Sequence, residues 1–159
     1  NLNDINSEIQ KLGQYVGARG RIEAEDVLKA VSRVKIDSIF DLTDAIGNND
    51  RARALMCLAN LLDHGQNEVG VLALVTRHVR ILRSINDGLK EGLAGAKLSA
   101  RAGVSPYFLK QYMDQARQWS PRKVEQTFTA LIDTDRALKS SPVASHIWLE
   151  NFIVQTCTV

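Results

Sequence analysis

Residues 68–89 read EVGVLALVTRHVRILRSINDGL, and this stretch decides the fold class of the chain. At the roughly 100° per residue of an α-helix, its apolar side chains cover about half of the circumference. The apolar positions are Val71, Val75, Val79, Leu82, Ile85 and Leu89. Arg77, Arg80 and Arg83 fall on the other half. The pattern therefore predicts one long helix with a broad buried face and a basic outer face.

The rest of the chain also has helical periodicity. Further helices are predicted over 4–16 and 24–32, after the capping residues Ser38 and Asp50, as a pair within 97–111, and over 121–139 and 143–157. No alternating run of apolar and polar residues bounded by turns occurs, so no sheet is predicted. About seven helices from Ser38 onward, joined by short loops and without a fixed repeat, predict an all-α helical bundle rather than a solenoid.

Three Ser-Pro steps, at 105–106, 120–121 and 141–142, are expected helix starts. In each step the serine can cap a helix. The proline fits the first helical position, because the N–H that it lacks has no helical partner there. A helix is therefore predicted to begin at or next to each of these prolines.

The composition is that of a globular protein. Hydrophobic residues make up 45% and charged residues 24% of the 159 residues, and the formal net charge is +2. No apolar run approaches the roughly 20 residues of a membrane helix, and the first residues lack the basic start and apolar core of a signal peptide. Because no methionine starts the chain, we expect a piece of a longer protein. Cys57 and Cys157 lie far apart beside apolar residues, which predicts buried, reduced thiols and a cytoplasmic location.

The sequence contains no constellation of residues for catalysis or cofactor binding. A phosphate-binding loop, a GxGxxG motif and a GxSxG motif are all missing. His64, His78 and His146 lack partners at metal-ligand spacing, so we expect solvated or capping side chains. Cys57 lies in an apolar helix, where a reactive thiolate is disfavoured. We therefore predict no catalytic residue, no metal site and no cofactor.

Residues 97–111, KLSARAGVSPYFLKQ, have the pattern of a helix-turn-helix. A recognition helix needs side chains near its start that reach base edges. Only Lys110 and Gln111 suit this role, because Tyr107 and Phe108 are better packing or partner contacts. The basic residues that follow lie too far along to share one groove with them, and they are Arg117, Arg122 and Lys123. We favour two packed helices over a DNA-reading motif, and both interpretations stay open at this point.

Two charged features are candidate contact or ion-pair sites. The strip formed by Arg77, Arg80 and Arg83 is either a solvated face or a contact for phosphate or acidic partner residues, because guanidinium groups suit both ligands. Asp135 falls on the apolar stripe of the helix over 121–139, which predicts a buried carboxylate in a structural ion pair. Its expected cationic partner is Arg77 or Arg80.

Three long segments carry a recognisable order of residues. They are SIFDLTDAIGNNDRARALMCLANLL (38–62), LALVTRHVRILRSI (72–85) and AGVSPYFLKQYMDQARQWSPRKVEQTFTALIDTDRALKSS (102–141). The pattern includes Phe40-Asp41, Ala45-Ile46, Arg77 with Arg80, Pro106 with Phe108, Ala116-Arg117, and Asp135 with Leu138-Lys139-Ser140. In this order and spacing the chain, from about Ile36 to its end, resembles the C-terminal half of the bacterial DNA polymerase III delta subunit, a clamp-loader component. The segment EIQKLGQYVGARGRIEAEDV (8–27) resembles the end of that family's preceding helical domain. Glu23 departs from the pattern, because the family more often has a serine or threonine cap there.

The resemblance implies both an architecture and a function. The expected architecture is a helical collar domain over 36–159, preceded at 1–35 by the end of a small helical AAA+ lid domain. The expected function is that of a non-catalytic accessory subunit of the polymerase holoenzyme, which joins other clamp-loader subunits through the collar.

The resemblance also implies partners. Contact with the sliding clamp is expected through an N-terminal domain outside this chain, and contact with primed DNA in the assembled complex, with no membrane partner. The candidate contacts to partners or DNA are Arg77, Arg80, Arg83, Lys110, Arg117, Arg122 and Lys123. The alternatives are a helix-turn-helix DNA-binding regulator and a generic helical interaction module.

Overall fold

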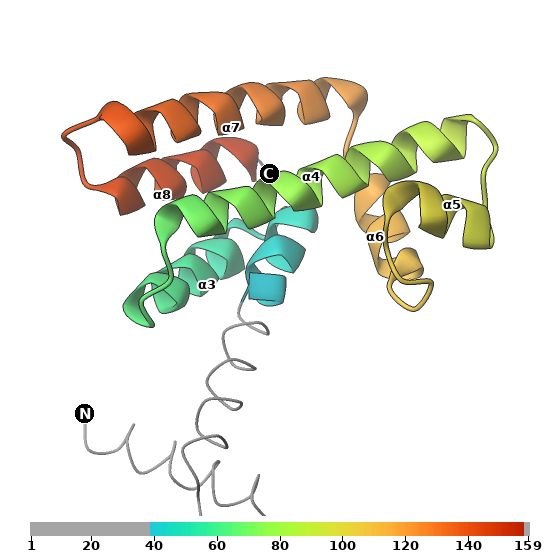
Figure 1. The fold of residues 1–159 in the computed structure, drawn as a ribbon, viewed down its shortest axis with the longest axis horizontal. Helices are drawn as coiled ribbons and strands as arrows, with labels where there is room; N and C mark the ends of the chain where they lie inside the picture. Colours follow the sequence, from blue (N-terminus) through green and yellow to red (C-terminus); the bar gives the residue numbers. More distant parts are fainter. Residues whose placement is uncertain (1–38, 158–159) are drawn as a thin grey trace, which may run out of the picture. The chain divides into compact units, whose positions relative to one another are not determined.

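The computed structural model describes residues 39–157, and within this range every regular element is a helix. The predicted all-α class is therefore confirmed, whereas the predicted helices over 4–16 and 24–32 and the predicted domain over 1–35 lie outside the described residues. A first helix covers 39–47 (Figure 1). The helices after it are α3 (Arg51–Asp63), α4 (Glu68–Lys90), α5 (Gly95–Ala102), α6 (Leu109–Ala116), α7 (Pro121–Ser140) and α8 (Ser145–Thr156).

α4 is the central helix of the bundle, as its periodicity predicts. The side chain of Asn67 caps it by accepting hydrogen bonds from two backbone N–H groups of the first turn. Its apolar face packs against α5, α6, α7 and α8. Leu82 and Ile85 on this face are 0% exposed, and burial of such side chains contributes about 1.5–3 kcal/mol each. Packing around α4 therefore provides much of the core.

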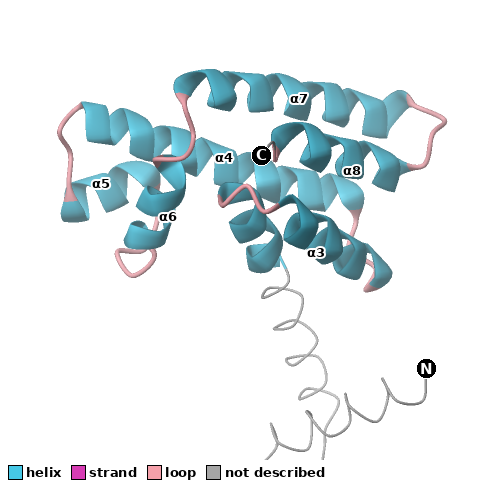
Figure 2. Ribbon diagram, turned by 180° about the vertical axis from the view of Figure 1, so that it is seen from behind, coloured by secondary structure: helices cyan, strands magenta, loops and turns pink. Residues whose placement is uncertain are grey.

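The other helices surround α4 on several sides (Figures 1 and 2). α7 and α8 form an antiparallel pair beside α4, and α3 packs against α8. α5 and α6 pack against the C-terminal half of α4. Arg51 Nε donates to the backbone oxygen of Cys157 over 2.8 Å, which joins α3 to the end of α8.

Only one of the three Ser-Pro steps starts a helix directly. Ser120 caps α7 by accepting a backbone hydrogen bond at 3.1 Å, with the proline in the first turn. At the other two steps the predicted start is wrong, because a turn intervenes: α6 begins at Leu109 and α8 at Ser145. There the hydroxyl oxygens of Ser105 and Ser141 accept from the backbone N–H two residues later. A serine hydroxyl can stabilise such a turn as readily as a helix start, so the dipeptide does not distinguish them.

Candidate partner-binding surface

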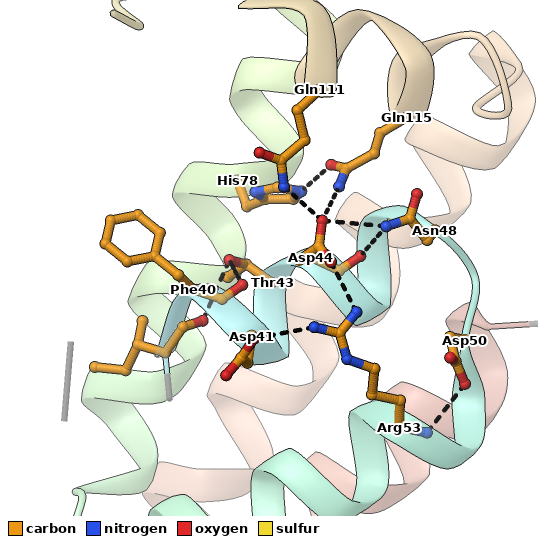
Figure 3. A network of polar contacts seen from close by, with 11 residues as sticks. Phe40, Asp41, Thr43, Asp44, Asn48, Asp50, Arg53, His78, Gln111 and Gln115 are labelled. Carbon is orange, nitrogen blue, oxygen red and sulfur yellow. Dashed lines mark hydrogen bonds and ion pairs between the residues drawn. The ribbon is translucent and has the colours of Figure 1, made fainter. Parts of the chain in front are cut away.

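A polar network centred on Asp44 fixes the position of α6 (Figure 3). The side chain of Asp44 is 21% exposed, and its Oδ1 accepts hydrogen bonds from Gln111 at 2.6 Å and Gln115 at 2.7 Å. Its Oδ2 pairs with Arg53 Nη1 at 2.8 Å, and the same guanidinium reaches Asp41 at 2.9 Å. These contacts link the first described helix to both α3 and α6.

The network continues into the core through His78. This side chain is 5% exposed, and its Nε2 donates to Gln115 Oε1 at 2.9 Å, in the tautomer that the acceptor requires. Burial lowers the pKa of His78 to about 4, although the Gln115 hydrogen bond and the charge of Asp44 oppose the shift. The expectation of a solvated or capping His78 is therefore wrong. Periodicity within α4 does not indicate which of its polar residues another helix will cover.

Gly47 makes room for the pair of His78 and Gln115. A Cβ atom at Gly47 would collide with the side-chain amide of Gln115 and lie 2.8 Å from His78 Nε2. The backbone oxygen of Gly47 also accepts the indole N–H of the buried Trp119 over 2.9 Å. Glycine at this position therefore allows three segments of the chain to meet.

This network was not predicted from the sequence. Asp44 and Arg53 are nine residues apart, on consecutive helices, and no helical rule pairs them. Gln111 and Gln115 are one turn apart in α6, so both amides fall on one side of the helix. That spacing was the one available signal, and it could not identify Asp44 as the acceptor.

The helix pair α5–α6 is packed against α4, and Lys110 and Gln111 of α6 are exposed. Gly103 ends α5 with φ 66° and gives the expected turn. Because α6 begins at Leu109, Tyr107 and Phe108 lie in the preceding turn, 85% and 46% exposed, with their ring centroids 4.9 Å apart. Gln111 is already bonded to Asp44. Of the two candidate base-reading side chains, Gln111 therefore already takes part in a hydrogen bond within residues 39–157, and Lys110 does not.

The arginine strip of α4 is exposed along its whole length, as its place on the helical wheel predicts. Arg77, Arg80 and Arg83 all have accessible side chains. Arg80 and Arg83 line a surface groove together with Arg101 of α5 and Phe128 of α7, whereas Arg77 does not line it. Two arginines of the predicted strip, Arg80 and Arg83, therefore line one groove. Arg101, which the sequence analysis did not connect with them, lines the same groove.

The remaining basic candidates lie on α6 and at the start of α7. Lys110 is exposed, and Arg117 is exposed with an ion pair of 3.5 Å to an aspartate three residues earlier. Arg122 is exposed in the first turn of α7. Lys123 is partly buried, because its Nζ lies 4.9 Å from the ring centroid of Trp119 and contacts an asparagine side chain, and burial lowers its pKa. Lys123 therefore contributes to packing and is less available than the others.

Asp135 forms an ion pair, but at the surface and with another partner than predicted. Its Oδ2 lies 2.7 Å from Lys139 Nζ, and 41% of the Asp135 side chain is exposed. The expectation of burial against Arg77 or Arg80 is therefore wrong. Thr134 occupies the buried position instead, and its hydroxyl donates to the backbone of the preceding turn at 2.7 Å. The buried face of α7 consists of Val124, Thr127, Leu131 and Thr134, so it keeps the predicted Val124 and Leu131 and leaves Asp135 at its edge.

The described part of the chain bears on the predictions about metal-ligating residues, membrane-spanning helices and thiols. Between residues 39 and 157 no three side chains of the metal-binding types come together. No helix in this range is both long and apolar enough to cross a bilayer. Cys57 and Cys157 are free, and burial raises the pKa of both thiols. Cys157 is buried as predicted, whereas Cys57 is only partly buried.

Comparison with known proteins gives consistent results. The family described as DNA polymerase III delta subunit, C-terminal domain, matches residues 36–156. The chain is 28% identical over 154 residues to DNA polymerase III subunit delta of Bacillus subtilis (strain 168), covering 97% of this chain and 44% of that protein. The solved structure of the Bacillus subtilis DNA clamp loader delta protein matches with a TM-score of 0.71 at 28% identity, over 98% of this chain and 46% of that one. The chain thus spans less than half the length of these relatives.

Proposed function

This chain belongs to the family formed by the C-terminal domain of the DNA polymerase III delta subunit, and from this premise we propose that it is the helical assembly module of a clamp loader. In this proposal the module joins the corresponding domains of other clamp-loader subunits in a helical collar. It has no catalytic step of its own and needs no cofactor. The family match over 36–156 is the observation that carries the proposal.

The surface of α8 supports an assembly role. One side of α8 is buried in the bundle through Leu149, Phe152 and Ile153. On another side Ile147 and Val154, two turns apart and hence on the same face, are 45% and 41% exposed. A helix that is apolar on both sides is typical of an element buried on both sides, and a neighbouring subunit would provide the second cover.

The proposal extends to partners outside the chain. The sliding clamp would be contacted through an N-terminal domain of the same subunit, and primed DNA in the assembled complex. Exposed basic side chains are the candidates for contacts to phosphate or to acidic partner residues, because guanidinium and ammonium groups bind both. They are Arg77, Arg80, Arg83, Lys110, Arg117 and Arg122, with Lys123 less accessible.

Sedimentation of this chain with and without the other clamp-loader subunits of its source tests the proposal. Alone it should be monomeric at micromolar concentration, and with those subunits it should form a hetero-oligomer, because collar domains meet different neighbours on each side. Ile147→Glu together with Val154→Glu should weaken the hetero-oligomer at least tenfold. Thr129→Glu, which adds the same type of charge to an exposed position of α7, is the matched control.

Two results would contradict the proposal. One is a chain that joins none of the other subunits. The other is a tight symmetric homodimer of the chain alone, which favours the DNA-binding regulator, because such regulators usually bind paired half-sites as dimers.

A further inference from the structure

A groove runs along the outer side of α4, where α5 and α7 meet it. Arg80, Arg83 and Asp87 of α4, Arg101 of α5 and Phe128 of α7 line a space of about 420 Å³. A second depression of about 200 Å³ shares two of these α4 residues and extends the groove along α4 towards the start of α7. The lining residues of α4 run from Arg80 to Lys90, about 15 Å of helix at 1.5 Å per residue, which matches about four residues of an extended chain.

The arginines of the groove differ in how they are held. The guanidinium of Arg101 is fixed by Glu91 through two hydrogen bonds of 3.0 and 3.1 Å. Arg83 lies 5.9 Å from the ring centroid of Phe128 and 3.7 Å from Asp87. Arg80 has an exposed side chain, whose guanidinium can bind an external carboxylate. The guanidinium of Arg101 is already oriented by Glu91, which reduces the side-chain entropy that a ligand contact to it would cost.

An apolar strip on α7 borders the same groove. Phe128 lines it, and Ile132 follows four residues later, hence on the same side of the helix, with 53% of its surface exposed. Phe128 is partly buried against the core, so Ile132 is the exposed apolar side chain beside the groove that a ligand could cover. The ligand must therefore offer apolar as well as anionic groups.

We propose that this groove binds an acidic peptide segment that carries at least one large apolar side chain, with its carboxylate on Arg80 and its apolar side chain on Phe128 and Ile132. A nucleic acid backbone fits less well, because it would place several phosphates beside Asp87 and Glu125, whereas a peptide needs only one carboxylate, at Arg80. The inference goes beyond the proposed function, because it names a ligand class and needs no other subunit.

The first test is a selection of random displayed peptides on this chain at about physiological salt, followed by fluorescence anisotropy with the enriched peptide. Acidic peptides with a large apolar residue should be enriched. Arg80→Gln should raise their Kd at least tenfold, a loss of about 1.4 kcal/mol. Lys139→Gln, which removes an exposed positive charge near the end of α7 and outside the groove, should leave the Kd unchanged. Circular dichroism checks that both variants stay folded.

A second arm measures labelled single-stranded and duplex DNA on the same variants. The proposal predicts that neither DNA shows a dependence on Arg80 as large as that of the peptide. It is overturned by a selection that enriches no acidic apolar class, by equal Kd values for wild type and Arg80→Gln, or by DNA that depends on Arg80 as strongly as the peptide. None of these outcomes bears on whether the chain joins other clamp-loader subunits, so the two proposals fail independently.

Discussion

Acidification below pH 6.5 should destabilise this domain through His78. An unfolded histidine takes up its proton at a pKa of about 6.5, whereas burial lowers the pKa of His78 to about 4 in the folded chain. As the pH falls through this window, the unfolded state binds a proton that the folded state cannot accept. The contribution of His78 is therefore fully present above about pH 6.5, and it is lost progressively towards pH 4. At about 1.4 kcal/mol per pKa unit, the loss amounts to about 3 kcal/mol.

Urea denaturation at a series of pH values from about 7.5 to about 4 measures this loss as a change in the free energy of unfolding. Carboxylates titrate in the same range, and Asp44 lies close to His78 through Gln115. The informative quantity is therefore the difference between wild type and His78→Gln, which keeps a donor of similar size but does not titrate. The variant should lose about 3 kcal/mol less than wild type over this range.

Two results would refute the reasoning about His78. Equal pH dependence in wild type and variant is one of them, because it means that burial does not shift the titration. The other is an NMR titration in which the His78 ring protons have a midpoint above about pH 6, which is incompatible with a buried neutral ring.

Two matched pairs of substitutions test the packing and the polar network. Gly47→Ala should reduce the free energy of unfolding by about 2–4 kcal/mol, because its Cβ would displace Gln115. Gly70→Ala, in α4 with open space around the new Cβ, should raise it by about 0.5–1 kcal/mol. Asp44→Ala should reduce the free energy of unfolding by about 2–3 kcal/mol, since it leaves the buried Gln115 amide without its acceptor and Arg53 with Asp41 alone. Asp135→Ala, at an exposed pair, should reduce it by less than about 0.5 kcal/mol. Chemical denaturation measures all four, and a Gly47→Ala variant as stable as wild type or an Asp135→Ala variant as costly as Asp44→Ala would contradict the account.

The sequence by itself determined the helical class and the surface of α4. Apolar residues recur at helical spacing between 68 and 89, and they form a stripe that covers about half of the helix. Such a stripe must be buried, whichever neighbouring elements cover it. The same wheel placed Arg77, Arg80 and Arg83 in solvent, since charged side chains without partners are excluded from a core. The order of residues over three segments was also sufficient to identify the family, since spacing is a property of the chain alone.

Only the tertiary structure decided which polar residues meet and which become buried. His78 lies in the same helix as the exposed arginines, and it is buried because α6 happens to cover that position. Asp44 accepts a hydrogen bond from Gln115, which is 71 positions away in the sequence. Helical periodicity predicts no contact between residues so far apart. Asp135 and Thr134 are adjacent at the edge of the buried face of α7, and in the folded chain the hydroxyl is buried whereas the carboxylate is exposed. Helical periodicity shows which side of a helix is apolar. Neighbouring helices, which the periodicity does not encode, determine which residues at the edge of that side become buried.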